Sequence, residues 1–338
     1  MNRAKALFFL LLVGIYACKT KPKTGDENTS AAEAPLAKAP VFNGDSAYAF
    51  VAKQVSFGPR VPNSKAHRTA GDWMVAKLKS YGFEVTEQTF VTPTYDGTRL
   101  NARNIIGSYN PQATKRIVLA AHWDTRPFAD KDSAKLKDKP FDGANDGGSG
   151  VGVLLEIARL IHASPDKPKV GIDIVLFDVE DWGEKEGMGS TSALKSFWAM
   201  GSQYWAKKPH KPGYSAYYGI LFDMVGAKGA RFPKEASSTR YASSIVNSVW
   251  ETAGRLGYGQ YFIDEEGGDV MDDHTAVNEV MKIPMIDIVE IATKAELGQT
   301  NKLFGDYHHT VSDNLEVIDP KVLKAVGQTA TQVIYGEE

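Results

Sequence analysis

The chain has 338 residues but only one cysteine, Cys18, so it can form no intrachain disulfide. It also lacks a basic excess. It has 39 Lys and Arg residues and 41 Asp and Glu residues, so its formal net charge is −2, which argues against nucleic acid as a partner. Because no disulfide can stabilise it, the fold must depend on its apolar core or on a bound metal. With 43% hydrophobic residues, the chain can bury such a core.

Long apolar runs are missing except at the N-terminus. Arg3 and Lys5 precede an apolar stretch at 6–16, which is too short to span a bilayer as a stable helix. This layout predicts a signal peptide at residues 1–17. The letters "IYAC" are similar to a bacterial lipoprotein box, so we expect lipidation at Cys18. A soluble export signal followed by an incidental cysteine is the alternative.

The segment after the signal is polar and has no apolar periodicity. Residues 18–42 combine Lys, Thr, Pro, Ala and acidic residues, which predicts a disordered, lipidated tether. A single folded domain is then expected at residues 43–338. The protein is expected to be exported and to stay membrane-anchored, as a periplasmic or cell-envelope lipoprotein.

Helix and strand patterns alternate along this domain. The predicted helices lie at 45–57, 63–82, 150–162, 190–200, 238–256, 273–280 and from 320 onward, and the predicted strands lie at 83–91, 101–109, 116–124, 171–181, 217–226 and 284–291. Several strands are continuous apolar runs, as in strands buried on both faces. We therefore predict an α/β fold: a three-layer sandwich whose mixed, mostly parallel central sheet is flanked by helices, with an antiparallel part at one edge.

Acidic residues collect where three predicted strands end. These are Asp124, which follows His122; Asp178, Glu180 and Asp181; and Asp223. In open α/β sheets, ligands bind beyond the carboxyl ends of the strands. Three connections add further polar residues: Asp142 and Asp146 in "FDGANDGGSG", Asp272, Asp273 and His274 in "MDDH", and His308, His309 and Asp313 in "GDYHHTVSDN".

Each cluster alone has a simple explanation. Asp146 could cap the helix that follows it, Asp272 and Asp273 could cap a short helix, and the paired histidines could lie on the surface. Their coincidence argues otherwise, because like charges buried together without a cation cost about several kcal/mol each. A divalent metal removes that conflict. Oxygen and imidazole ligands without cysteine suit zinc, among other metals.

The motifs together resemble a known family. The order "AHWD", "GAND", Glu180-Asp181, "FDMVG" and "YHHTVSDN" is similar to that of the zinc-dependent aminopeptidase superfamily, over roughly residues 45–336. "AHWDTRPFAD" and "PFDGANDGGSGVGVLLEIAR" look like the bacterial glutaminyl-peptide cyclotransferases (glutaminyl cyclases) related to the animal enzymes. The resemblance implies an acyltransferase that converts the N-terminal glutamine of peptides or proteins to pyroglutamate with release of ammonia.

The resemblance also implies a metal site and a proton-transfer residue. One zinc ion per chain would bind to Asp146, Asp181 and His309. The family usually has a glutamate where Asp181 stands, so this ligand is one methylene shorter here. Glu180 would move the proton.

The remaining roles concern the surroundings of these groups. Asp223 and Asp273 match the two acids that hydrogen-bond with the catalytic glutamate in cyclases. Phe304 matches an aromatic of the substrate pocket, and His308 stands where the animal enzymes carry a pocket tryptophan. Trp182 is expected to form a pocket wall, with core packing as the alternative. The loop 126–141 is expected to be solvated; it could instead cover the site or bind another ion.

A two-zinc aminopeptidase is the main alternative function. It would add His122 and Asp223 as ligands, with Asp146 bridging the two ions that activate a hydroxide. "MDDH" and Phe304 favour the cyclase. A non-catalytic metal-binding descendant is disfavoured because such a protein could lose Glu180 freely, and Glu180 is present here. The expected partners are peptides with N-terminal glutamine and, through the lipid, a membrane; no nucleic acid is expected, and we expect a monomer.

Overall fold

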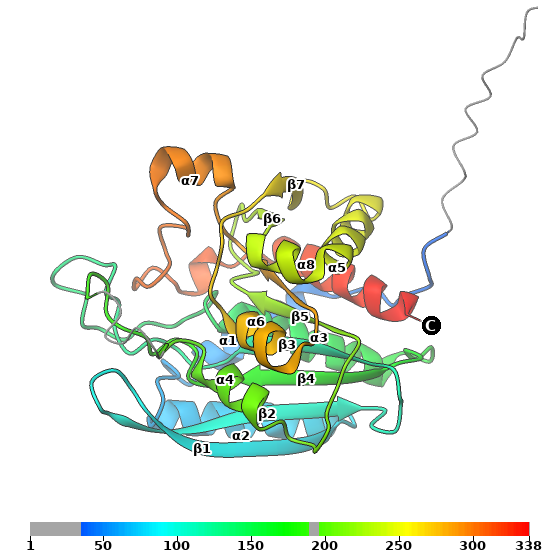
Figure 1. Ribbon diagram of the computed structural model, residues 1–338, viewed down its shortest axis with the longest axis horizontal. Coiled ribbons are helices and arrows are strands. Elements are labelled where there is room, and N and C mark those ends of the chain that lie inside the picture. Colours follow the sequence, from blue (N-terminus) through cyan, green and yellow to red (C-terminus); the bar gives the residue numbers. More distant parts are fainter. Residues whose placement is uncertain (1–34, 189–195, 338) are drawn as a thin grey trace, which may run out of the picture. The chain divides into compact units, whose positions relative to one another are not determined.

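A computed structural model describes residues 35–188 and 196–337 (Figure 1). The chain divides into the units Met1–Pro35 and Leu36–Glu338, and the second holds every element named below. The predicted signal peptide, Cys18 and most of the predicted tether lie outside the described residues. Within the described part of the chain, no helix combines the length and the apolarity that a membrane span needs.

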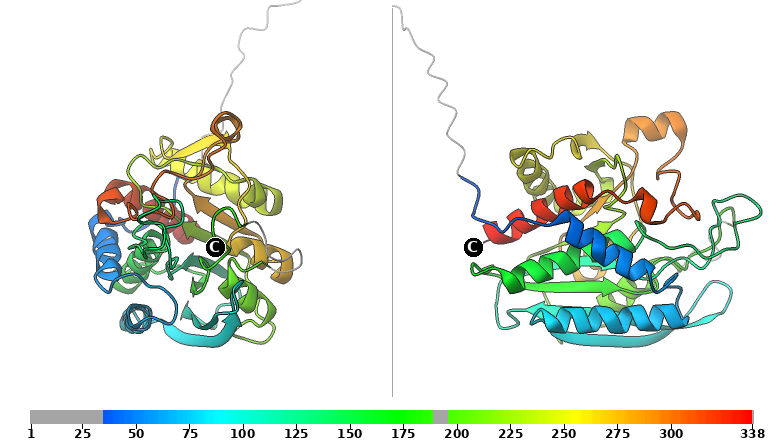
Figure 2. Two further views of the ribbon diagram at one scale, coloured as in Figure 1. Left: turned by 90° about the vertical axis from the view of Figure 1, so that its left-hand side faces the viewer. Right: turned by 180° about the vertical axis from the view of Figure 1, so that it is seen from behind.

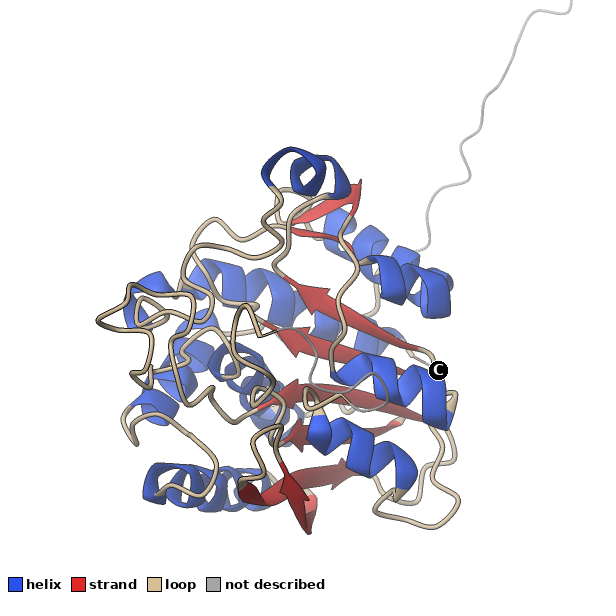
Figure 3. Cartoon of the chain, turned by 60° about the vertical axis from the view of Figure 1, so that its left-hand side comes forward, coloured by secondary structure: helices blue, strands red, loops and turns tan. Residues whose placement is uncertain are grey.

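A six-stranded sheet forms the centre of the second unit (Figure 3). In spatial order its strands are β1 (Glu84–Pro93), β2 (Arg99–Tyr109), β4 (Gly171–Phe177), β3 (Arg116–His122), β5 (Tyr218–Asp223) and β8 (Met285–Val289). The pairs β1–β2 and β2–β4 are antiparallel, whereas β4, β3, β5 and β8 run parallel. The predicted mostly parallel sheet with an antiparallel edge is confirmed.

Helices cover both faces of the sheet (Figure 1, Figure 2). The larger core packs α1 (Gly44–Val55), α2 (Lys65–Ser80), α3 (Gly148–Ala163), α5 (Ala236–Arg255) and α8 (Pro320–Gly336) against the sheet. The smaller core includes α4 (Met200–Lys207) and the π-helical turn η1 (Val277–Met281), which follows α6 (Asp273–Ala276). Strand β3 shows the reason for two layers, because Ile117 and Leu119 enter the larger core and Val118 enters the smaller one. The predicted three-layer sandwich is confirmed.

The strand register brings the acidic strand ends together. Residue His122 at the end of β3 pairs with Phe177 at the end of β4, so the acidic segment 178–181 begins beside that histidine. On the other side, β5 pairs with both β3 and β8 in parallel and ends at Asp223. Parallel strands place their carboxyl ends at one edge, where the side chains that follow can converge.

Some elements were not predicted. The two-stranded sheet of β6 (Phe232–Lys234) and β7 (Phe262–Glu266) pairs short segments that are distant in sequence, and α7 (Lys294–Thr300) has no buried residue and so no apolar periodicity. The short 3₁₀ turn η2 (Leu315–Val317) was also missed. The helix predicted at 190–200 lies partly outside the described residues, and α4 begins only at its last residue.

The folded unit begins before the predicted boundary at residue 43. Phe42 is 1% exposed, and its backbone N–H donates to the side-chain oxygen of Gln328 in α8 at 2.8 Å. Gln332 donates to the carbonyl of Ala37 at 2.7 Å. Residues 36–42 are therefore part of the second unit rather than of a disordered tether.

Candidate active site

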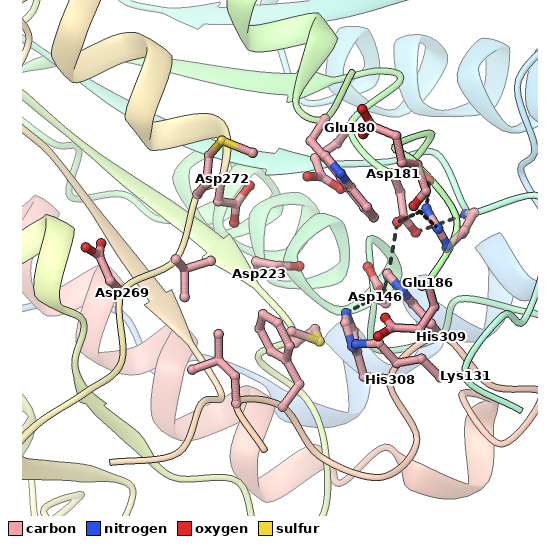
Figure 4. A pocket seen from close by; sticks show the side chains of 18 residues that line it. Lys131, Asp146, Glu180, Asp181, Glu186, Asp223, Asp269, Asp272, His308 and His309 are labelled. Atoms are coloured by element: carbon pink, nitrogen blue, oxygen red, sulfur yellow. Dashed lines mark hydrogen bonds and ion pairs between the residues drawn. The ribbon is translucent and has the colours of Figure 1, made fainter. Parts of the chain in front are cut away.

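A cavity of about 250 Å³ lies beyond the carboxyl ends of the parallel strands (Figure 4). Seven of the nine residues predicted for the site line it: Asp146, Glu180, Asp181, Asp223, Phe304, His308 and His309. The other two, Trp182 and Asp273, do not. The sequence motifs thus converge on one pocket.

The turn before α3 presents Asp146 to the cavity. The carboxylate of Asp313 accepts hydrogen bonds from the backbone N–H groups of Asn145 and Asp146, at 2.7 and 3.0 Å. Gly147 has a φ of +78°, and a Cβ there would approach the carbonyl oxygen of Asp124 to 2.6 Å. Only glycine suits this turn, and Asp313 holds it in place.

A strained turn after β4 positions Glu180 and Asp181. Val179 has a φ of +52°, a conformation that is costly for a β-branched residue. Asp124, which is fully buried, accepts from the backbone N–H of Glu180 at 3.0 Å and of Asp181 at 3.3 Å. Asp124 therefore supports the site by holding the backbone of both acids.

Arg126 makes a second support that sequence reasoning missed. Its buried guanidinium donates to the carbonyls of Asp181 and Glu184 at 3.1 and 2.9 Å, and it pairs with Asp130. Its backbone N–H donates to Asp181 Oδ2 at 3.0 Å. Arg126 and Lys131 both line the cavity, so the loop 126–141 is in part a wall of the site, not a solvated loop throughout. Arg126 lies within the quoted "AHWDTRPFAD", but that motif gave it no role, and Lys131 lies just beyond it.

Three side chains leave atoms suited to a metal. Asp146 Oδ2 and Asp181 Oδ1 are buried and, within the described residues, accept no hydrogen bond. His309 Nε2 lies 3.5 Å from the first oxygen and 3.1 Å from the second, and Figure 4 shows the three side chains meeting. Unpartnered buried oxygens facing an imidazole nitrogen are what a bound cation would satisfy. The predicted ligand set fits zinc.

The protonation states also suit a cation. Burial lowers the pKa of His309 to about 3, so the imidazole is neutral at ordinary pH, the form that binds metals. Burial alone would raise the pKa of Asp146, but its hydrogen bond with His122 holds it well below the ordinary range. An ionised carboxylate thus faces a neutral histidine.

Two neighbouring histidines add further groups that could hold a metal. Asp146, His308 and His309 form one such group, although His308 Nδ1 already lies 2.7 Å from the Lys131 amine. His122, Asp146 and Asp223 form another. In that second group, His122 Nε2 contacts Asp146 at 3.0 Å and Asp223 at 3.2 Å, so these atoms are satisfied by one another.

The pKa of Glu180 is raised, so this side chain can hold a proton at a higher pH than an ordinary glutamate. Burial raises its pKa well above the ordinary value, and the charges of Asp272 and Asp181 add to the rise against the opposing effect of His122. Burial also raises the pKa of Asp223 to about 7, again with a contribution from Asp272. The pocket thus holds carboxyl groups that can take up a proton near neutral pH.

The second acid of this network sits at a different position from the one expected. Asp272 lines the cavity, whereas Asp273 is fully buried outside the lining. Asp272 is the extended N-cap of α6 and Asp273 is its first helical residue, so the two side chains leave the backbone in different directions. The charges of both aspartates raise the pKa of Glu180, so Asp273 still acts on it from outside the lining, while Asp272 is the one of the two that reaches the cavity.

The tryptophan of the pocket wall also differs from the expected one. Trp182 packs against Phe90, Leu100 and Met200 in a small core cluster, outside the cavity lining. Trp198 lines the cavity instead and stacks in parallel with His309 at 5.9 Å between ring centroids. A Cβ on Gly183 would overlap the Trp198 ring, so the glycine makes room for it.

Comparison with known proteins agrees with this geometry. The sequence profile of peptidase family M28 matches residues 104–334. The chain belongs to this family. Glutaminyl cyclase of Bacteroides thetaiotaomicron has a similar structure, 47% identical, with a TM-score of 0.84 over 89% of this chain and 100% of that one.

Other similar proteins carry both kinds of name. A zinc-dependent exopeptidase of Parabacteroides distasonis is 50% identical, with a TM-score of 0.84 over 89% of this chain and 100% of that one. The glutaminyl-peptide cyclotransferase of Bos taurus is 25% identical over 258 residues, which are 68% of this chain and 64% of the bovine protein. The chain thus spans less than two thirds of that curated relative.

Proposed function

We propose that the chain is a zinc-dependent glutaminyl-peptide cyclotransferase, which converts the N-terminal glutamine of peptides or proteins to pyroglutamate and releases ammonia. One observation carries the proposal: Glu180, an acid with a raised pKa, lies in the same pocket as the unpartnered oxygens of Asp146 and Asp181 and the His309 nitrogen that faces them. The similarity to the Bacteroides glutaminyl cyclase supports it.

Zinc, when bound, would polarise the side-chain carbonyl of the substrate glutamine and stabilise the negative charge that develops on its oxygen. The residues that would hold it are Asp146, Asp181 and His309, whose facing atoms are described above. Arg126 and Asp124 hold the Asp181 side chain and backbone, so this ligand is positioned before any metal binds.

The pocket residues then have two tasks. The walls, including Trp198 and Phe304, orient the substrate so that its own α-amine lies against its side-chain carbonyl, which can lower the barrier by many kcal/mol, roughly 7–11 at best. Glu180 accepts a proton from the attacking amine and returns it to the departing nitrogen. A C–N bond forms within the substrate, another breaks, and ammonia leaves.

We propose one zinc per chain. The atoms that lack partners belong to Asp146 and Asp181, whereas the atoms of His122 and Asp223 that would hold a second ion already contact each other. A single cation therefore relieves the conflict at the ligand set. Asp272 stays outside this ligand set, and its charge helps to keep the pKa of Glu180 high.

A di-zinc aminopeptidase is the second candidate. It is favoured by the group of His122, Asp146 and Asp223, which could hold a further metal, and by the exopeptidase name of one similar structure. In that enzyme a metal-activated water would cleave the first peptide bond and shorten the peptide.

Localisation and assembly are further parts of the proposal. We propose that Cys18 carries a lipid, that the protein is exported to the periplasm or cell envelope and anchored there, and that it acts as a monomer. The support is the "IYAC" motif behind a basic, then apolar, N-terminus.

The function is tested by ammonia release from matched peptides. A peptide with N-terminal glutamine should release ammonia, and the same peptide with an acetylated α-amine should release none, because its nucleophile is blocked. Ammonia from both peptides at equal rates would mean that water attacks the side-chain amide, which refutes cyclisation. Free amino acid from an N-terminal leucine peptide, without ammonia from the glutamine peptide, would select the aminopeptidase.

A further inference from the structure

A second group of buried polar side chains lies behind the Asp272 wall of the pocket. Asp287 comes from β8, His274 from α6 and Glu235 from the N-cap of α5. These three residues are fully buried, and Asp272 is 4% exposed. One ligand-type atom each from Asp272, His274 and Asp287 lies within 4.8 Å of the other two, and His274 Nε2 lies 3.4 Å from Glu235.

These groups have too few hydrogen-bond donors. Within the described residues, both oxygens of Asp287, both ring nitrogens of His274 and Oδ2 of Asp272 make no hydrogen bond. The charges that raise the pKa of Asp287 come from Asp272, Asp223 and Glu235, all acidic, and the His274 ring is the titratable group that lies among them. A buried cluster of this kind requires protons or a cation, because isolated ionised carboxylates are too costly to bury.

Glu235 is the member that stays ionised. Its carboxylate accepts from the backbone N–H groups of Ser237, Ser238 and Val270. Although burial opposes ionisation, the nearby His274 ring and the Ser238 backbone donor lower the pKa of Glu235 to about 2. Glu235 is therefore the natural acceptor for one ring N–H of His274, which leaves the other ring nitrogen for Asp287.

We propose that Glu235, His274, Asp287 and Asp272 form a buried proton-sharing chain in which one proton bridges the carboxyl groups of Asp272 and Asp287. Asp287 is then a positioning residue for Asp272. The backbone N–H of Asp273 holds one oxygen of Asp272, and the shared proton holds the other. Asp272 and Glu180 both line the pocket, and the charge of Asp272 raises the pKa of Glu180.

Burial and the neighbouring charge of Asp272 raise the pKa of Asp287 well above the ordinary value, which agrees with this arrangement. In the unfolded chain Asp287 ionises near its ordinary pKa of about 4. Above that pH, folding therefore takes up one proton, and the folding equilibrium constant should fall with rising pH.

The first test measures this proton and does not depend on the enzymatic function. Urea unfolding of the metal-loaded protein is measured between about pH 5 and pH 8 for wild type and Asp287→Asn, whose amide supplies a permanent donor to Asp272. As pH rises, the folding equilibrium constant of the wild type, divided by that of Asp287→Asn, should fall by up to about tenfold per pH unit. The exposed Asp306→Asn, which alters a surface ion pair, is the matched control and should follow wild type.

Equal pH dependence of wild type and Asp287→Asn would overturn the shared proton. So would a second metal ion in the purified wild type that is absent from Asp287→Asn, because Asp272, His274 and Asp287 would then be ligands of a cation. Metal content is measured on the same samples.

The second test concerns positioning and rests on the proposed function. Asp287→Leu keeps the branched shape of the side chain but removes both donor and acceptor, so kcat for the glutamine peptide should fall by about tenfold or more, while KM and zinc content change little. Asp287→Asn should recover most of that loss. Equal kcat in Asp287→Leu and wild type would refute the positioning role. A wild type that releases no ammonia would instead refute the proposed cyclase function. The pH dependence of unfolding would still test the proton-sharing group of side chains.

Discussion

Glu180→Gln tests the proton-transfer role with the smallest change of shape. The substitution keeps the size and the backbone contacts of Glu180, which run through its N–H to Asp124 at 3.0 Å. It removes only the ability to take and return a proton. Because Glu180 is not one of the three ligands, the variant should keep its zinc.

The magnitude follows from what a positioned acid–base group contributes. Such a group typically accelerates a reaction by about 10²–10⁴-fold, which corresponds to about 3–5 kcal/mol of barrier. The burial and raised pKa of Glu180 favour a large effect. We expect kcat to fall by at least about 10²-fold, with KM for the glutamine peptide changed by less than about threefold.

The assay is ammonia release under saturating substrate, with zinc content measured on the same preparation. The exposed Glu265→Gln is the matched control, because it is the same chemical change outside the cavity. Wild-type kcat in Glu180→Gln would refute the proton role. Loss of zinc from this variant would show that Glu180 is a ligand.

Three further predictions concern the metal, the wall and the anchor. Asp181→Ala should lose zinc, and added zinc should no longer raise its melting temperature, whereas it does in wild type; zinc retention by the variant would remove Asp181 from the ligand set. Trp198→Ala should raise KM by about tenfold with a smaller change in kcat, since the stacked wall beside His309 is lost; an unchanged KM would exclude substrate contact. Cys18→Ser should move the protein from the membrane fraction to the soluble fraction while its activity persists; unchanged membrane association would argue against the lipid.

The fold could be predicted from sequence because its central elements carry local signals. Strands such as β3 and β4 are buried along their whole length and appear as apolar runs, and the Gly-rich turn marks the start of α3. Elements without such patterns were missed. β6 has only three residues and pairs with a strand that is distant in sequence. α7 buries none of its residues, so its sequence shows no apolar face.

The site could be predicted where chemistry follows a strand end. Glu180 and Asp223 line the cavity because parallel strands deliver their carboxyl ends to one edge, and Asp146 reaches the same cavity from the turn before α3. Adjacent positions were harder to separate. "MDDH" offers two aspartates, and only the N-cap geometry of α6 decides that Asp272 and not Asp273 reaches the cavity.

The supporting residues could not be predicted because they come from loops. Arg126 reaches Asp181 through backbone carbonyls, and Trp198 enters the pocket from the segment before α4. Neither contact leaves a pattern in the neighbouring sequence. Trp182, next to the acids, turned instead into the cluster that contains Phe90.

The mass of the product tests the central claim most directly. A purified peptide that begins with glutamine is incubated with the zinc-loaded protein, and the product is analysed by mass spectrometry. The account predicts loss of one ammonia per peptide, with every residue of the chain retained. A product shortened by its first residue, with the glutamine recovered free, would contradict the cyclase and identify an aminopeptidase.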